Sequence, residues 1–212
     1  FIKPSVLGTV AVTTTPETKS LGFAIYYWLV NAGAMIGPTI AYFVRDSFGN
    51  EFVYVVSAIS CLAMLIVNML LYKEVKGTGP EVVESLGKKI TNLFVVLANT
   101  KFMIFLLIYS LYWIIFWQEF IIVPYYITDY IDVNAPYEII QSWAGAGAII
   151  LLQIPINRLS KNIPTRKAIL LGFAFSSLIW IIIGISPSIP TIAAGIVAFA
   201  IGEMMQAPRY YE

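Results

Sequence analysis

Long apolar runs separated by short polar segments dominate the chain. Six of these runs reach the roughly 17–25 residues that a helix needs to cross a bilayer. They cover residues 21–44, 52–72, 102–127, 138–156, 168–186 and 189–208. Residues 1–15 continue the pattern as the end of an earlier helix, and the alternation over about ten residues that marks membrane barrel strands is missing. The pattern predicts an all-α, polytopic membrane protein with seven helices, the first of them partial.

The composition agrees with this prediction. The chain has 212 residues, of which 59% are apolar and 12% charged, whereas soluble domains average about 25% charged residues. A net charge of +1 argues against a nucleic-acid partner. The single cysteine, Cys61, and the lack of histidine argue against disulfides and Cys/His metal sites, and no H-E-x-x-H or G-x-S-x-G motif indicates an enzyme. We therefore expect no catalytic site, no cofactor and no metal.

Basic residues are distributed unevenly between alternate loops. The loops at 16–20, 73–101 and 157–167 hold ten of them. The intervening loops hold only Arg45, among several acidic residues. Because cytoplasmic loops of membrane proteins are enriched in Lys and Arg, the ten-residue side is predicted to be cytoplasmic. We expect a multi-pass integral protein of the plasma or inner membrane, with the last helix running from outside to inside.

The longest connection, 74–100, contains a helical pattern of its own. Its apolar residues recur at helical spacing, with two lysines, Lys88 and Lys89, between them. The apolar set is Val82, Val83, Leu86, Ile90, Leu93 and Leu97. This pattern predicts an amphipathic helix at the inner membrane surface. Two interpretations stay open: a linker between two moving halves, or an ordinary loop on the lipid headgroups.

Four polar residues lie inside the predicted spans, where each needs a partner or a water-filled cavity. At about 1.5 Å per residue, Lys3 and Asn31 lie roughly 20 and 18 Å from the cytoplasmic side. Glu203 lies roughly 20 Å from the outer side. Glu119 is placed about 27 Å along its helix, close to the outer surface, where its carboxylate can reach water. A structural role is the alternative for each: an interfacial Lys3, an interhelical Asn31, a paired or protonated Glu203.

The stretch FAIYYWLVNAGAMIGP at 23–38 has two distinct faces. Gly33, Gly37 and Ala41 fall on one stripe, a small-xxx-small spacing that lets helix backbones approach closely. Tyr27 and Asn31 fall on a second face, which presents a phenol and an amide. We therefore predict helix packing through the first face and a cavity beside the second.

Four stretches of the chain resemble the proton-coupled oligopeptide transporter family. FAIYYWLVNAGAMIGP is similar to a family signature with an aromatic pair, Asn and Gly-small-apolar. IKPSV is similar to the family's fourth helix, YWIIFWQE at 112–119 to its seventh and GEMMQAP at 202–208 to its tenth. The resemblance implies a major facilitator fold, of which this chain carries about seven of the twelve helices, from helix four to helix ten.

That resemblance also implies a domain organisation. Residues 1–73 would be the end of the N-terminal six-helix half, with helices four to six. Residues 74–100 would be the cytoplasmic amphipathic linker, and 101–212 the start of the C-terminal half, with helices seven to ten. The family takes up di- and tripeptides or related small zwitterions with protons by alternating access, so we expect a small-molecule substrate, protons and the lipid bilayer as partners of a functional monomer.

The site residues follow from the matched motifs. Lys3 would couple to the proton site and the substrate carboxyl, Asn31 would hydrogen-bond the peptide backbone, and Glu203 would hold the substrate's amino terminus. The predicted substrate site comprises Lys3, Tyr27, Asn31, Trp113, Trp117 and Glu203. The predicted proton-coupling residues are Lys3, Glu119 and Glu203.

Two departures from the family pattern keep other functions open. The helix-seven glutamate of the family falls on Trp117 here, and the glutamate is displaced to Glu119. The family's Gln-x-x-Asn-Pro in helix eight reads QSWAG here, with Ala144 and Gly145 at the last two places. A major facilitator transporter for a sugar, drug or metabolite is the first alternative. A non-transporting receptor on the same fold is the second.

Overall fold

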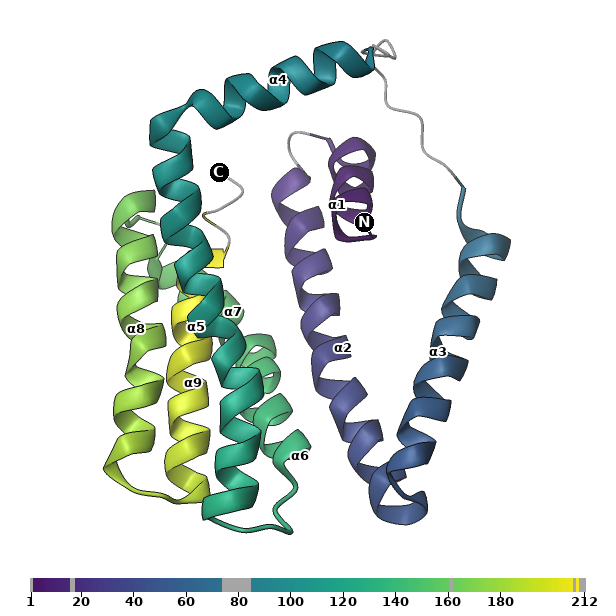
Figure 1. The fold of residues 1–212 in the computed structure, drawn as a ribbon, viewed down its shortest axis with the longest axis vertical. Coiled ribbons are helices and arrows are strands. Elements are labelled where there is room, and N and C mark those ends of the chain that lie inside the picture. The colour runs from purple at the N-terminus through teal and green to yellow at the C-terminus, as the bar shows by residue number, and fades with distance from the viewer. Residues whose placement is uncertain (1, 16–17, 74–84, 161, 208, 210–212) are drawn as a thin grey trace.

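A computed structural model gives the fold of the chain (Figure 1). It describes residues 2–15, 18–73, 85–160, 162–207 and 209. The side chains of residues 2–4, 19–21 and 24 lie outside this description. Lys3 is one of them, so the predicted role of its ammonium group stays a prediction.

The described residues are arranged as helices joined by short connections. In chain order the elements are α1 (Ile2–Thr13), α2 (Lys19–Phe48), α3 (Asn50–Leu71), α4 (Leu86–Ala98), α5 (Thr100–Tyr130), α6 (Tyr137–Ser142), the π-helix η1 (Trp143–Gly147), α7 (Ala148–Ser160), α8 (Thr165–Ile185) and α9 (Ile189–Gln206). Each apolar run predicted to span the membrane coincides with helical structure over nearly all of its described residues, and the all-α class is confirmed for the residues described.

Five of the described helical segments are long and apolar enough to cross a membrane. They are α3, α5, the continuous segment Tyr137–Ser160, α8 and α9. The sequence predicted six full spans, and the sixth is α2, which is 30 residues long. Its tyrosines, Asn31 and Pro38 make α2 less apolar than the other five. This helix therefore has the length of a span but a lower hydropathy than the other five.

The densest packing lies between α8 and α9. A Cβ at Gly202 would collide with the Gly172 carbonyl oxygen and with backbone and side-chain atoms of Ser176. The two glycines therefore allow a backbone contact that larger residues would prevent. The Ser176 hydroxyl donates to the Phe199 carbonyl at 3.5 Å, a long bond across the same interface.

Apolar side chains around α9 complete the core. One cluster joins α5, α8 and α9 through Val123, Ile179 and Ile196. A second cluster joins α7 and α9 through Ile149 and Met204, and Tyr27 of α2 packs against it. Since Tyr27 comes from the other end of the sequence, this cluster ties α2 to the later helices.

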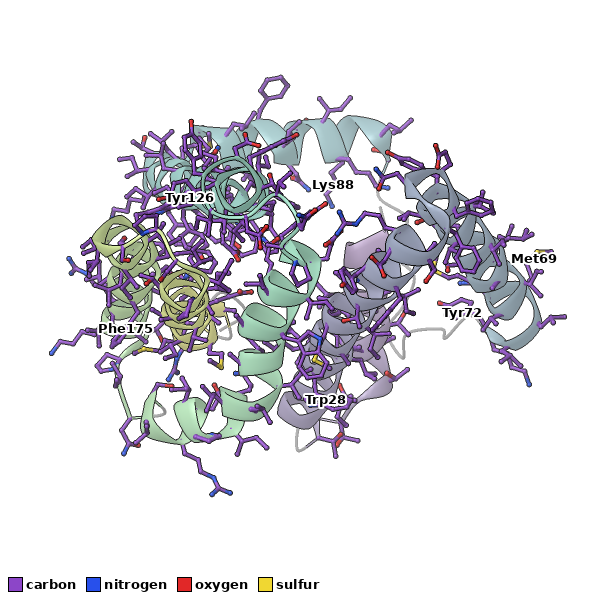
Figure 2. The ribbon with its side chains drawn as sticks, turned by 90° about the horizontal axis from the view of Figure 1, so that it is seen from below. Trp28, Met69, Tyr72, Lys88, Tyr126 and Phe175 are labelled. Atoms are coloured by element: carbon purple, nitrogen blue, oxygen red, sulfur yellow. The ribbon has the colours of Figure 1, made fainter. Side chains whose placement is uncertain are left out.

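The third helix has the opposite character. None of its residues is buried among the residues described, and Figure 2 shows Met69 at the outer edge of the molecule. Met69 is 76% exposed although it is apolar. Such a continuous apolar surface is unfavourable in water and favourable in lipid.

Candidate functional site

Tyr27 and Glu203 meet inside the helix bundle. The Tyr27 hydroxyl donates to Oε1 of Glu203 at 3.2 Å, although 176 positions separate the two residues. Tyr27 lies about 12 Å from the start of α2 and Glu203 about 21 Å from the start of α9. Both positions are inside the thickness of a bilayer core of ~30 Å. A carboxylate and a phenol from opposite ends of the chain therefore share one site within the membrane.

Asn31 lies one helical turn beyond Tyr27. Its side chain is 8% exposed, and its Nδ2 donates to the Tyr27 carbonyl oxygen at 2.9 Å. This bond runs within α2. An interhelical bond of Asn31, the structural alternative to a binding role, is not seen among the described residues. The amide oxygen makes no hydrogen bond to any residue the structure describes, which leaves an acceptor beside the Tyr27–Glu203 contact.

Glu119 is buried, contrary to the prediction that its carboxylate can reach water near the outer surface. Its exposure is 3%, because α6 packs against this part of α5. Gln141 of α6 donates through Nε2 to the Glu119 carbonyl oxygen at 3.2 Å and, more weakly, to its Oε1 at 3.5 Å.

The predicted tryptophans are placed differently from one another. Trp113 is half-buried and packs edge-on against Phe116, with ring centroids 4.7 Å apart. Trp117 is 56% exposed, and its ring contacts among the described residues are Phe116 and Phe120 of the same helix. The structure does not bring Trp117 to the Tyr27–Glu203 contact, because its side chain leaves α5 on a different face from Glu119.

The predicted glycine stripe of α2 faces open space. A Cβ at Gly33 or Gly37 would meet no described atom within 4 Å, and Ala41 is half-buried. The face that packs against α6 and η1 is instead the one carrying Met35, whose Sδ would lie 3.7 Å from a Cβ at Gly147. A packing role for the stripe is thus not seen among the described helices and stays a prediction.

The far end of α2 is joined to α6 by an ion pair that the sequence analysis did not identify. Arg45 Nη2 donates to Glu138 Oε2 at 3.1 Å, and Nε lies 2.9 Å from Oε1 as a close charge contact. The guanidinium also lies over the rings of Tyr42 and Tyr137, 5.8 and 5.4 Å from their centroids. A signal was present in the sequence: Arg45 is the one basic residue in otherwise acidic loops.

A second contact lies between this ion pair and the Tyr27–Glu203 site. The indole Nε1 of Trp143 donates to Thr39 Oγ1 at 3.1 Å. Trp143 begins η1, where the WAGAG sequence forms a π-helix within the span. A π-helix widens one turn and changes which side chains point toward a neighbouring helix. Local sequence preference does not predict this turn, since alanine and glycine fit either geometry.

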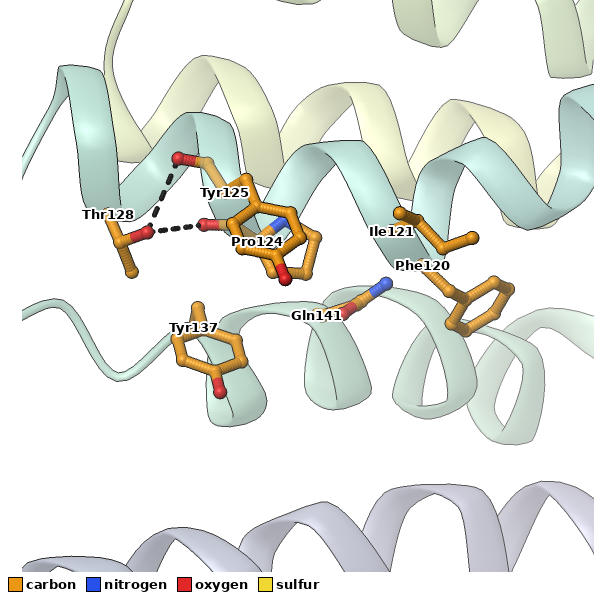
Figure 3. Close-up of a pocket in the computed structure, with 7 residues that line it drawn as sticks. All are labelled: Phe120, Ile121, Pro124, Tyr125, Thr128, Tyr137 and Gln141. Carbon is orange, nitrogen blue, oxygen red and sulfur yellow. Dashed lines mark hydrogen bonds between the residues drawn. The ribbon is translucent and has the colours of Figure 1, made fainter. Parts of the chain in front are cut away.

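A pocket of about 420 Å³ opens between α5 and α6 (Figure 3). Its lining is mostly aromatic and apolar, with an amide and hydroxyl groups at the edges. The lining residues are Phe120, Ile121, Pro124, Tyr125, Thr128, Tyr137 and Gln141. Gln141 also donates to Glu119 Oε1 at 3.5 Å, so the pocket borders the buried carboxyl group. No cluster of metal-ligating residues occurs among the described positions.

The fold and the buried polar groups define a multi-pass helical membrane protein with an internal polar site. The family model described as Major Facilitator Superfamily matches residues 1–209, and the chain belongs to that family. It is therefore a major facilitator transporter, whose substrate is a small molecule moved across a membrane. No curated protein and no solved structure matches the chain in these comparisons. The match does not specify the oligopeptide branch.

Proposed function

We propose that the protein is a secondary active transporter that couples proton movement to the uptake of di- and tripeptides, or a related small zwitterion. The observation that carries this proposal is the hydrogen bond from Tyr27 to Glu203. It supports a site in which a carboxylate, held by a phenol, receives the substrate's ammonium group. Charge-assisted hydrogen bonds of this kind are stronger than neutral ones.

Asn31 supplies the second recognition element of the proposed site. Its amide oxygen, unused among the described residues, can accept from a peptide N–H. Its amide nitrogen is already committed to the Tyr27 carbonyl, which fixes the orientation of the side chain. An acceptor held in place binds with a smaller loss of side-chain entropy than a mobile one. The role of Lys3 toward the substrate carboxyl rests on the resemblance of IKPSV alone.

Glu119 is proposed as the proton carrier, with Glu203 and Lys3 completing the coupling set. Its carboxyl group is buried and interacts with an amide rather than a cation among the described residues. A lone carboxylate is costly in such surroundings, and protonation removes that cost. Its helix α5 contacts α9, which carries Glu203, and this contact supports coupling between the two carboxyl groups.

Alternating access follows from the contacts of α2. Residues 1–73 and 101–212 are proposed to belong to the two halves, with 74–100 as their cytoplasmic linker. The Arg45–Glu138 pair and the Trp143–Thr39 bond join α2 to α6 and η1 at the predicted outer end. This arrangement supports a state closed to the outside, from which the site would open when these contacts break.

A different small solute is the second candidate, because two family positions depart from the pattern. Trp117 is exposed away from the Tyr27–Glu203 contact, and Ala144 and Gly145 lie in the π-helix η1. Neither supplies the polar groups of the oligopeptide-transporter pattern that the sequence resembles. The pocket beside Gln141 offers aromatic walls that suit a partly apolar solute.

The test is uptake of labelled dipeptides by the full-length protein in liposomes under an imposed pH gradient, inside alkaline. The proposal predicts accumulation that collapses when a protonophore removes the gradient. Glu203→Gln should abolish it, whereas Glu51→Gln, an exposed carboxylate at the start of α3, should leave it intact. Absence of gradient-dependent uptake across a dipeptide panel, with sugar or drug uptake present, would replace the peptide proposal by the second candidate.

A further inference from the structure

The connecting helix α4 lies across the ends of the transmembrane helices instead of alongside them (Figure 1). It contacts α5, which begins at Thr100 directly after it. Every residue of α4 is exposed among the residues described. Because α5 is a candidate span of high hydropathy, its first turn marks the membrane boundary. The helix α4 therefore lies at the level of the membrane surface.

Capping residues in the sequence determine where α4 begins and ends. The Ser85 side chain accepts from the Lys88 backbone N–H at 3.4 Å and begins the helix. Asn99 ends it with an extended backbone, and its side chain accepts from the Phe102 N–H at 3.2 Å to begin α5. Side-chain oxygens at these positions are typical helix caps. Two capped helices joined at one residue produce the sharp bend seen in Figure 1.

One side of α4 is a row of large apolar residues. At about 100° per residue, Leu86, Ile90, Leu93 and Leu97 fall within an arc of roughly 60°. Their exposures are 78%, 54%, 55% and 45%. These four apolar side chains lie in a helix of 13 residues, and all four are exposed among the described residues. A surface of this shape is typical of helices that lie in the membrane interface.

The two lysines of α4 occupy different positions relative to this row. Lys89 projects about 70° from the middle of the row, whereas Lys88 projects about 170° from it. Figure 2 shows Lys88 on the side of α4 that faces the middle of the molecule. Lys89 thus lies at the border of the apolar side. From there its stem can follow apolar surface and its ammonium group can reach a phosphate.

We propose that α4 binds an anionic phospholipid leaflet, with the Leu86–Leu97 row among the acyl chains and Lys89 on a lipid phosphate. The positive-inside distribution makes this the cytoplasmic leaflet. Anionic lipid is the occupant that fits both features, since burial in hydrocarbon is favourable for the row and a negative charge beside Lys89 is favourable for its ammonium group. The proposal concerns the linker and does not depend on the identity of the transported solute.

The test places a fluorescent label on either side of α4 in the full-length protein. Cys61, an exposed free thiol, is first changed to serine. Single cysteines then replace Ile90, in the apolar row, or Asn92, about 160° away, and carry an environment-sensitive dye. The protein is reconstituted into phosphatidylcholine liposomes with and without phosphatidylglycerol. Brominated lipid tails report contact with hydrocarbon, and iodide reports contact with water.

The proposal predicts that brominated lipid quenches the Ile90 label and that iodide quenches the Asn92 label. Phosphatidylglycerol should increase the lipid quenching at position 90, because one lysine at an anionic surface strengthens attraction roughly fivefold. Lys89→Gln should remove that increase, and Lys88→Gln, the matched control, should keep it. Iodide quenching at position 90, protection of that label from both quenchers, or an equal effect of the two lysine variants would overturn the proposal.

Discussion

Arg45 of α2 and Glu138 of α6 form an ion pair that joins segments 93 positions apart in the sequence. Their side chains are 32% and 11% exposed, so the pair is neither fully solvated nor fully buried. The rings of Tyr42 and Tyr137 flank the guanidinium. A pair held in this way contributes more than a mobile surface pair and can still be separated at low cost. These are the properties that a reversible closure requires.

Arg45→Ala is therefore predicted to favour the outward-open state. Loss of about 1 kcal/mol corresponds to a change of roughly fivefold in the ratio of closed to open molecules. The measurement is the distance between two spin labels, attached at Phe48→Cys and Val133→Cys in a Cys61→Ser background. In Arg45→Ala, a larger fraction of molecules should show the long distance. Both labelled positions are exposed.

The ion-pair prediction has two controls. Asp46→Asn changes the neighbouring exposed charge and should leave the distances unchanged. The exchange Arg45→Glu with Glu138→Arg should restore the closed population in part, since the attraction is rebuilt in reverse. An unchanged distance distribution in Arg45→Ala would show that the pair does not control closure.

Tyr27→Phe is predicted to weaken substrate binding without disturbing the fold. The change removes the hydroxyl that donates to Glu203 and keeps the ring that packs against the α7–α9 cluster. The hydroxyl fixes the position of the Glu203 carboxylate, so its loss should raise KM by roughly the severalfold that a loss of preorganisation costs. Tyr26→Phe, next to it in the chain and half-buried, is the matched control. Equal KM values for the two variants would remove Tyr27 from the site.

Glu119→Gln is predicted to separate transport from proton coupling. The glutamine keeps the size of the side chain and an oxygen that can accept from Gln141, but it cannot carry a proton. Uptake driven by a pH gradient should fall to background, whereas exchange of labelled for unlabelled substrate should continue. Asp129→Asn, an exposed residue of the same helix, should behave as wild type. Full gradient-driven uptake in Glu119→Gln would assign the proton to another group.

Gly202→Ala is predicted to destabilise the protein through the α8–α9 contact. The added methyl group would collide with the Gly172 carbonyl and with Ser176, and backbone atoms cannot move aside as a flexible side chain does. Overpacking of this kind costs about 1–3 kcal/mol. Thermal unfolding in detergent should show a lower midpoint. Gly184→Ala, where no described atom lies within 4 Å of the added Cβ, should unfold like wild type.

Much of the fold follows from hydropathy alone, because span length and helix formation are both imposed by the bilayer. Angular position along α2 likewise placed Tyr27 and Asn31 on one face, and the structure finds them hydrogen-bonded one turn apart. The contact of Tyr27 with Glu203 has no local signal. Only the resemblance of two distant motifs to one family places both residues in the same predicted site. Nothing in residues 23–38 indicates which helix lies opposite Tyr27.

The prediction for Glu119 is wrong for a physical reason. Counting residues from Lys101 gives the height of Glu119 along α5, but its burial comes from α6, whose Gln141 donates to it. Hydropathy does not indicate which element packs against α5.

For the stripe of Gly33, Gly37 and Ala41, close packing stays a prediction, whereas Gly172 and Gly202 make a close contact between α8 and α9. Spacing identifies residues that permit close packing, but the partner helix decides which of them are used.

The central claim is that Glu203 receives the ammonium group of a zwitterionic substrate. It is tested most directly by measuring KM for a dipeptide and for the same dipeptide with an acetylated amino terminus, in wild-type protein and in Glu203→Gln. Wild type should prefer the free amine by at least about tenfold, the effect of one charge-assisted hydrogen bond. Glu203→Gln should lose that preference and treat both compounds alike. A preference for the free amine that persists in Glu203→Gln would contradict the claim.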